Sequence, residues 1–491
     1  MLYAAPFNPP IIRQLLRINI GLMVCIEFIM NAMLSFSSSY LCGGLGMTLH
    51  TYSLTTAVYA GTAILMIAQH HWLVSHLGYR RFIRYALVFF TVGSLICANA
   101  DAAPLFIFGR IIQAIGGSAF FTAARVHVNF FAPTPAGRGL AIRYMAYSLV
   151  GGSAMAAFLA ALILEHYSWR ALFLIQLPQI AAVWWLTGKT TSNVRKLRPS
   201  GKLHPANMFC LVAGVFVLQY IVENAPYDYF SDESLFCGLL LLAIIGLGLF
   251  VWFEHQRHHS LLSFRHFFSS RYLAGLMIYA LCYLVIASTN YLIPIFLQKG
   301  LSFPVLNCGA LLTTTSLCSL IFAWLHLKVS AKYSNQKHYL LFAFACLSVF
   351  GLLSSHLSSG IRLWDMAIPL IFLSGFAAIG QGTAAFNTFR ETDSRLFSQA
   401  YQTKNMLREL MNSTAVSLTN VFLQTREAEH YTRLAENVNE RTIAHYSVSI
   451  SQLYNLASQQ SVVMSCLDAF WGIGVAGGLF FIFSWWQKKI V

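Results

Sequence analysis

The sequence has little charge and few acidic residues. Charged residues make up 10% of its 491 positions, and 17 Asp and Glu stand against 32 Lys and Arg. A soluble domain typically has about 25% charged residues, so this composition excludes an ordinary water-soluble protein. Hydrophobic residues reach 57% and aromatic residues 14%, which excludes a disordered chain, because such chains are poor in both. We therefore predict a protein embedded in the lipid bilayer.

Motifs for catalysis and metal binding are also missing. The ten cysteines contain no C-x-x-C pair, which argues against redox chemistry, and no metal site is expected. The sequence has no G-x-x-x-x-G-K-[ST] phosphate loop, no G-x-S-x-G turn and no H-E-x-x-H helix. These absences argue against an enzyme, against direct use of ATP and against a bound cofactor.

Long apolar runs cover most of the chain. A membrane-spanning helix needs about 20 largely apolar residues. About fourteen such segments occur, near 17–40, 52–74, 82–100, 104–128, 139–164, 169–188, 205–223, 234–254, 273–297, 305–327, 338–356, 364–388, 401–423 and 465–486. The connections are short except for the polar segment 424–463, which we interpret as a solvated loop rather than a short surface helix.

Basic residues gather in alternate connections, for example Arg80, Arg81 and Arg84 after the second predicted span. The other connections hold acidic residues such as Asp101 and Glu165. By the positive-inside rule, this asymmetry predicts a multi-pass protein of the plasma (inner) membrane with both termini in the cytoplasm. The net charge of +15 then reflects topology, and no nucleic-acid partner is expected.

Two charged residues lie deep inside predicted spans. A charge at the bilayer centre costs roughly 2.5–3.5 kcal/mol, so it normally faces a cavity or a partner. Glu27 lies near mid-depth, with Asn31 one turn later on the same face; it either binds a proton or cargo, or is satisfied by a neighbouring helix. Arg110 precedes a run of small residues at 114–119 that suits close helix packing. Packing does not explain Arg110 itself.

Other charges near predicted span ends have simpler interpretations. Arg408 and Glu409 lie near the cytoplasmic end of the thirteenth span, where snorkelling suffices. Asp468 opens the last span and is interpreted as a helix cap. Glu223 closes the seventh span at the outer surface, where we expect it to be solvated.

Five short motifs follow one another along the chain: R-I-I-Q-A-I-G-G at Arg110–Gly117, Y-S-W-R-A-L-F-L-I-Q-L-P at Tyr167–Pro178, S-L-L-S-F-R-H-F-F at Ser260–Phe268, Y-L-I-P-I-F-L-Q-K-G-L-S at Tyr291–Ser302 and N-M-L-R-E-L at Asn405–Leu410. In type and order they resemble motifs of the major facilitator superfamily, specifically its fourteen-helix drug:proton antiporter branch of EmrB/QacA type. The resemblance runs over nearly the whole chain.

Two motifs of that branch are altered. The loop after the second span keeps Gly78, Arg80 and Arg81 as candidate gating residues, but Ser75 stands where the family has an aspartate. The glycine-proline motif of helix five is replaced by alanines, at positions 156, 157, 160 and 161. The resemblance therefore implies a gating latch of a different kind and a fifth helix without its Gly-Pro bend.

The resemblance implies an all-α integral membrane protein of the major facilitator fold, with about 14 transmembrane helices. We expect one six-helix bundle in residues 1–190 and two linking helices in 191–260. A second six-helix bundle would occupy 261–491, with an extracytoplasmic loop near 424–463. Transporters of this kind bind substrate near the bilayer midplane, between their repeats.

The expected function is proton-coupled export of amphipathic small molecules, either drugs or an endogenous metabolite such as a siderophore, driven by the proton gradient. Alternatives are an importer of an organic solute and a membrane receptor or scaffold that transports nothing. Glu27 and Arg110 are the expected proton-coupling residues. Contacts to the small-molecule substrate are expected from Asn31, Gln113, Tyr147, Asn290, Tyr291 and Gln381. A periplasmic adaptor and an outer-membrane channel are further expected partners.

Overall fold

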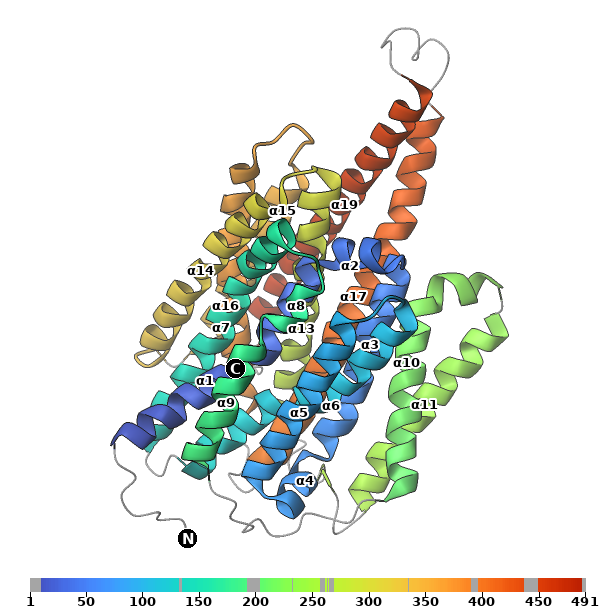
Figure 1. Ribbon diagram of the computed structural model, residues 1–491. Coiled ribbons are helices and arrows are strands. Elements are labelled where there is room, and N and C mark those ends of the chain that lie inside the picture. The colour runs from blue at the N-terminus through green and yellow to red at the C-terminus, as the bar shows by residue number, and fades with distance from the viewer. Residues whose placement is uncertain are drawn as a thin grey trace.

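The computed structural model describes residues 10–131, 135–191, 204–231, 233–256, 261–262, 264, 269–333, 335–389, 396–436 and 449–487. Long helices run roughly side by side through these residues, and short helices and turns join them (Figure 1). We call the end where α1 begins and α4 lies the basal end, and the opposite end, where α2 lies, the distal end. The predicted fold class, an all-helical membrane protein of the major facilitator fold, is confirmed.

The first part of the chain forms α1 (Pro10–Phe36), α2 (Ser38–Leu45), α3 (Leu49–Ala68), α4 (His70–Leu77), α5 (Tyr79–Ala98), α6 (Ala103–Phe131), α7 (Pro135–His166), α8 (Ala171–Leu174) and α9 (Leu177–Thr190). Two further long helices, α10 (Pro205–Ser231) and α11 (Glu233–Gln256), follow. Each predicted span therefore has a helix, although several ends differ. The first predicted span, for instance, is divided at Ser37 into α1 and the short α2.

The rest of the chain forms α13 (Ser270–Ile295) with the π-helical turn η1 (Phe296–Gly300), α14 (Val305–Ser330), α15 (Gln336–Ser355), the 3-10 turn η2 (Leu363–Met366), α16 (Ala367–Thr388), α17 (Phe397–Ala435) and α19 (Ile450–Trp486). By length and composition, 13 helical segments of the described residues can cross a membrane. The remaining long helix, α17, is too polar to count among them, since Lys404, Arg408 and Glu409 fall within six positions.

The expected loop at 424–463 is mostly helical, so its interpretation as a solvated loop is wrong for the described part. Residues to Ala435 continue α17, and α19 begins at Ile450; the two helices reach beyond the rest of the bundle at the distal end (Figure 1). Polar helices form here because their charges pair. Asp468 lies inside α19 rather than at a cap, where it accepts from Arg426 Nε at 2.8 Å and lies 2.8 Å from His430 Nε2.

Gly116 of the R-I-I-Q-A-I-G-G motif on α6 and Gly93 on α5 allow these two helices to come into close contact. A Cβ atom on Gly93 would lie 2.3 Å from the backbone nitrogen of Gln113, and one on Gly116 would lie 2.2 Å from the Ala86 carbonyl oxygen. Any side chain at either position would push the helices apart. The prediction that this stretch is packing surface is confirmed.

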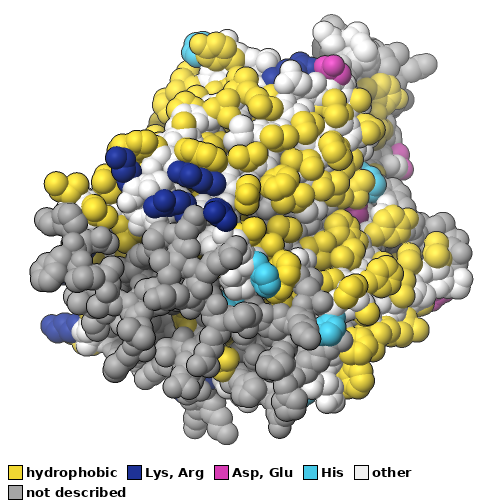
Figure 2. Space-filling view, turned by 60° about the horizontal axis from the view of Figure 1, so that its bottom comes forward, with side chains coloured by type: hydrophobic (Ala, Val, Ile, Leu, Met, Phe, Trp, Pro, Cys, Tyr) yellow, Lys and Arg dark blue, Asp and Glu magenta, His cyan; other side chains and the backbone are white. Residues whose placement is uncertain are grey.

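The flanks of the bundle are apolar, as a lipid-facing surface requires. Large side chains of α11 are exposed, among them Leu241, Ile244 and Trp252. Figure 2 turns the basal end forward and shows broad hydrophobic areas together with a group of Lys and Arg side chains. The motif at Ser260–Phe268 lies mostly outside the described residues.

Candidate functional site

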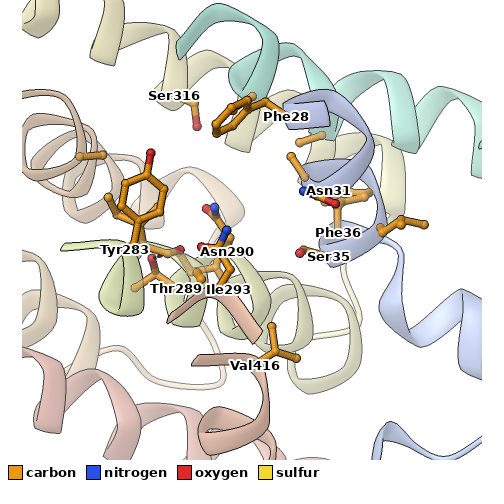
Figure 3. Close-up of a pocket in the computed structure, with 18 of the residues that line it drawn as sticks. Phe28, Asn31, Ser35, Phe36, Tyr283, Thr289, Asn290, Ile293, Ser316 and Val416 are labelled. Carbon is orange, nitrogen blue, oxygen red and sulfur yellow. Dashed lines mark hydrogen bonds between the residues drawn. The ribbon is translucent and has the colours of Figure 1, made fainter. Parts of the chain in front are cut away.

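A cavity of about 260 Å³ lies near the middle of the bundle. Helices α1, α3, α6 and α7 line it from the first part of the chain, and α13, α14, α16 and α17 line it from the second. Figure 3 shows Asn31 of α1, Tyr283 and Asn290 of α13, and Ser316 of α14 around this space. The cavity therefore lies between the two parts of the chain.

The lining of the cavity is amphipathic. Its polar side chains include the amides of Asn31, Asn290 and Gln381, three residues expected from the sequence to contact substrate. Apolar side chains such as Phe28 and Ile293 stand between them. Such a mixture of apolar surface and a few placed polar groups is typical of a small-molecule site.

Contacts join the two parts of the chain on both sides of the cavity. On the distal side, the rings of Tyr52 and Tyr291 stack with centroids 5.9 Å apart. On the basal side, Asn405 Nδ2 donates to Thr122 Oγ1 at 2.9 Å, and this asparagine opens the N-M-L-R-E-L motif. The motif thus closes the space below the cavity.

An ion triad of Glu27, Arg408 and Glu409 forms one wall of the cavity. The guanidinium of Arg408 donates to the carboxylates of both Glu27, on α1, and Glu409, on its own helix α17. Only 1% of the Arg408 side chain is exposed, so the interpretation of Arg408 and Glu409 as snorkelling residues is wrong. Because α17 begins at Phe397, Arg408 is about three turns into the helix and cannot reach the membrane surface.

The ion triad retains hydrogen-bonding capacity. Within the described residues, Glu27 Oε2 and Arg408 Nε and Nη1 are buried without a hydrogen-bond partner. Aromatic rings stabilise the cation instead: the Arg408 guanidinium lies 4.6 Å from the centre of the Phe121 ring and 5.0 Å from that of Phe28. Two carboxylates share one guanidinium, so the fully ionised triad has a net charge of −1.

Arg110 also lines the cavity, but it does not pair with Glu27. Its guanidinium donates to Gln113 on the same helix and lies 4.1 Å from the centre of the Tyr59 ring. Gln113 in turn donates to Ser94 Oγ at 2.9 Å. This chain of contacts attaches Arg110 to α3 and α5, so it is a second fixed cation of the cavity wall.

The structure brings together Glu27, Arg110, Asn31, Asn290 and Gln381 around one space. The other residues expected to contact substrate do not line it; these are Gln113, Tyr147 and Tyr291. Gln113 is buried behind Arg110, and Tyr291 is buried against Tyr52.

Lys404 is a buried basic residue that sequence reasoning missed. Its side chain is 4% exposed, and its Nζ lies 4.1 Å from the ring centre of Tyr279 and 4.7 Å from that of Tyr401. Phe121 and Phe389 complete the aromatic surroundings. The signal was present in the sequence, because Lys404 immediately precedes the N-M-L-R-E-L motif and is charged within a predicted span.

The expected gating loop after α3 is largely the short helix α4, which ends at Leu77, directly before Gly78. Gly78 has a φ of +78°, a conformation that favours glycine. Ser75 donates to the Trp72 carbonyl of its own helix at 2.7 Å, so it cannot replace an aspartate in a latch. Arg80 donates to the Thr191 carbonyl at the end of α9, whereas Arg81 is exposed.

Burial keeps a histidine of α4 neutral. Desolvation, together with the charge of neighbouring His71, lowers the pKa of His70 to about 3, so its imidazole has no charge at pH 7. Among the described residues, no group of three or more His, Cys, Asp or Glu side chains is placed to hold a metal ion.

A threonine joins α7 to α14 where the family's Gly-Pro motif is missing. Thr313 Oγ1 accepts from the Phe158 backbone N–H at 3.1 Å and donates to the Ala154 carbonyl at 2.9 Å. These are the two groups that an α-helix joins directly, so the hydroxyl is inserted beside the helical ladder of α7. The alanines allow this approach: a Cβ on Gly309 would lie 2.4 Å from the Ala161 Cβ.

We expect Thr313→Val to lower the free energy of unfolding by about 0.5–1.5 kcal/mol, because valine keeps the shape but removes the hydrogen bonds that the hydroxyl makes between α14 and α7. Thermal unfolding of the detergent-purified protein measures the effect. Thr314→Val is the matched control, since the Thr314 hydroxyl is exposed and bonds only to Ala310 of its own helix. Equal destabilisation by both variants would contradict the role of Thr313.

Comparison with known proteins agrees with this geometry. A family profile described as Major Facilitator Superfamily matches residues 20–402. A protein of Enterobacter sp. (strain 638) named "Putative multidrug resistance protein MdtD" is 24% identical over 396 residues, which cover 78% of this chain and 79% of that protein. The "Uncharacterized MFS-type transporter YhcA" of Bacillus subtilis (strain 168) is 22% identical, with coverage of 89% and 86%.

Solved structures show the same fold. The partially occluded inward-open xylose transporter XylE from E. coli superposes with a TM-score of 0.63 at 12% identity, over 97% of this chain and 98% of that one. An auto-inhibited peptide transporter of the POT family gives a TM-score of 0.62 at 14% identity, with coverage of 95% and 96%. The chain therefore belongs to the Major Facilitator Superfamily, and it is a multi-pass membrane protein that acts as a secondary transporter of small molecules rather than as an enzyme.

Proposed function

We propose that this protein exports amphipathic small molecules in exchange for protons. The observation that carries the proposal is the ion triad, which joins α1 to α17 at one wall of the cavity through Arg408, Glu27 and Glu409. Transport by alternating access requires the two bundles to separate on one side of such a cavity at a time. A charge pair between the bundles makes that separation depend on protonation.

The charge of the triad explains how exchange would be enforced. Its net charge of −1 is neutralised either by one proton on a carboxylate or by one cationic group of the cargo. Binding of the proton and binding of a cation therefore compete, which is the requirement for antiport. Because the carboxylates are coupled through Arg408, the proton belongs to the pair rather than to one residue.

The cavity wall supports an amphipathic cargo. Apolar groups such as Phe28 and Ile293 would contact the hydrophobic part, and the amides of Asn31, Asn290 and Gln381 would contact polar groups. Export of drugs is favoured over export of an endogenous metabolite such as a siderophore, since relatives include proteins named for multidrug resistance. With this function, the protein belongs to the drug:proton antiporter branch.

We further propose that the basal end faces the cytoplasm of a bacterial inner membrane, with both termini on that side. Arg80 and the exposed Arg81 lie at that end, in agreement with the positive-inside rule. The extension formed by α17 and α19 would then project into the periplasm (Figure 1), where an adaptor leading to an outer-membrane channel would contact it.

Reconstituted vesicles test this function. Purified protein in proteoliposomes with an acidic interior should accumulate ethidium, a cationic amphipathic dye, in exchange for internal protons. Collapse of the pH gradient by nigericin should stop the accumulation. Dye movement that is indifferent to the gradient would contradict proton coupling, and protein-free vesicles provide the baseline.

Comparison of growth media by mass spectrometry tests the direction and the cargo in cells. A compound that is missing outside and accumulated inside a deletion strain supports export and identifies an endogenous cargo. A nutrient left unconsumed by the deletion strain would instead favour an importer. No flux of any compound in cells or vesicles would favour a receptor or scaffold.

A further inference from the structure

The charged side chains that line the central cavity form two separate sites. Among the described residues, the charged members of the lining are Glu27, Glu409, Arg408 and Arg110, and the rest of that lining, such as Asn290, is uncharged (Figure 3). Arg408 pairs with both carboxylates, so the ion triad keeps a net charge of −1. Arg110 stands outside the triad with a charge of +1. The cavity therefore presents an anionic site and a cationic site to the same space.

The guanidinium of Arg110 has hydrogen-bond donors to spare. Its Nη1 donates to Gln113, and one face of the guanidinium lies against the Tyr59 ring. Within the described residues, its Nε and Nη2 make no hydrogen bond, and neither is among the polar atoms buried without a partner. These two nitrogens therefore border the open space of the cavity, where they can donate to a bound molecule.

The surroundings hold Arg110 in a fixed position. Gln113, which accepts from Arg110, donates in turn to Ser94 of α5. The close approach of α5 and α6 at Gly93 and Gly116 keeps these contacts in place. A charge at this depth is costly and normally faces a partner. No carboxylate of the described residues forms an ion pair with Arg110, so its partner is expected to be a ligand.

The other buried carboxylate near these helices does not fill that role. Glu223 of α10 has a side chain that is 0% exposed, so the expectation that it is solvated is wrong. It accepts from the hydroxyl of Ser53, and its Oε1 lies 3.9 Å from Nε2 of His50. Glu223 is not part of the cavity lining. Its contacts are therefore with α3, and the cationic site of the cavity has no acidic partner from α10.

The balance of charge favours a cargo that has both signs of charge. Binding of a simple cation at the triad would leave the lining and its cargo with a net charge of +1 in a site that contains little water. Such an uncompensated charge is costly in a low-dielectric interior. A cargo that also has an anionic group would leave the complex neutral. Its carboxylate would receive charge-assisted hydrogen bonds from the Arg110 guanidinium, a geometry that suits the planar guanidinium well.

We propose that the cargo is an amphipathic zwitterion, whose carboxylate binds Arg110 while its cationic group binds the ion triad. The inference rests on the proposed function, since it names the chemical class of the exported molecules. Arg110 is then the residue that selects a zwitterion over a simple cation of the same shape.

Two dyes that differ by one methyl ester test this selection. Rhodamine 110 has a cationic xanthene and a free carboxylate at neutral pH, and rhodamine 123 is its methyl ester, which has the positive charge alone. Fluorescence anisotropy with detergent-purified protein gives a dissociation constant for each dye. Wild type should bind rhodamine 110 about tenfold or more tightly than rhodamine 123, because only the free carboxylate accepts charge-assisted hydrogen bonds from Arg110.

Arg110→Gln should weaken binding of rhodamine 110 by about tenfold or more and change binding of rhodamine 123 by less than about threefold. The ester thus reports whether the cavity of the variant is intact. Arg110→Lys, which keeps the charge but not the planar fork, should retain part of the preference. The matched control is Arg433→Gln, since the Arg433 side chain is 65% exposed on the distal extension of α17. It should bind both dyes as wild type does.

Rhodamine 110 that binds wild type no more tightly than its ester would overturn the inference. Equal loss of both dyes in Arg110→Gln would overturn it as well, because Arg110 would then only support the shape of the cavity. Binding at one pH needs no proton gradient, so the cargo class is tested separately from proton exchange. If ethidium accumulation ignores the gradient while the preference for rhodamine 110 persists, proton coupling fails and the zwitterionic cargo stands.

Discussion

Replacing Arg408 with methionine is expected to abolish proton-driven transport and to lower the free energy of unfolding by about 3–5 kcal/mol, because it leaves two buried carboxylates without their cation. The side chains of Glu27 and Glu409 are 2% and 3% exposed, so solvent compensates little for the loss of the guanidinium. Thermal unfolding in detergent and ethidium accumulation in proteoliposomes measure the two effects.

A triple variant separates stability from transport. Combining Arg408→Met with Glu27→Gln and Glu409→Gln removes all three charges, and the free energy of unfolding should return toward the wild-type value. Transport should remain absent, since no group is left to exchange a proton. If Arg408→Met alone keeps both stability and transport, the ion triad is not the coupling element.

Glu27→Gln is expected to reduce proton-driven transport by roughly 100-fold or more, because the acid–base group is lost, while the protein stays folded. Glutamine has the size of glutamate and can still accept a hydrogen bond from Arg408, so α1 and α17 remain joined. The matched control is Glu165→Gln, since Glu165 is exposed at the distal end of α7. Unchanged ethidium accumulation by a folded Glu27→Gln protein would remove Glu27 from the mechanism.

Arg408→Met and Glu27→Gln should differ in their effect on the contact between the two bundles. Arg408→Met removes the connection between the bundles, whereas Glu27→Gln preserves a neutral version of it, similar to a permanently protonated carboxylate. Exchange of the cationic dye ethidium should also fall in Glu27→Gln, because its neutral triad no longer attracts a cation, but the free energy of unfolding should stay near the wild-type value. A stable Glu27→Gln protein beside a destabilised Arg408→Met protein would show that the triad has two tasks, one in joining α1 to α17 and one in binding the proton or the cargo.

Helix α17 unites these functions. It supplies Arg408 and Glu409 to the cavity, Lys404 and Asn405 to the basal side, and Ser413, whose hydroxyl donates to Gln219 of α10. The same residues make it more polar than the 13 helical segments that can cross a membrane by length and composition, although its part at 401–423 was predicted as a span. A helix of this kind is stable in a membrane only because its polar face is covered by other helices.

The sequence by itself determined the class of protein, the long helices and the family. Membrane spans are recognisable because the hydrocarbon thickness demands about 20 apolar residues in a row, which is a local property. Local reasoning also indicated that Glu27, a charge at mid-depth, needs a cavity or a partner, but it left open which of the two Glu27 has. The sequence did not predict where α17 ends and where α19 begins. These parts of the two helices consist of polar residues and form no apolar run.

Only the tertiary structure decided which charges meet. Glu27 and Arg408 lie 381 positions apart, and no spacing rule connects residues on helices from different halves. Arg408 and Glu223 each had a local explanation, as a snorkelling residue and a solvated one, and both explanations failed once neighbouring helices covered them. Burial and partnership of a polar side chain depend on what packs against its helix, and the chain's own local pattern does not contain that information.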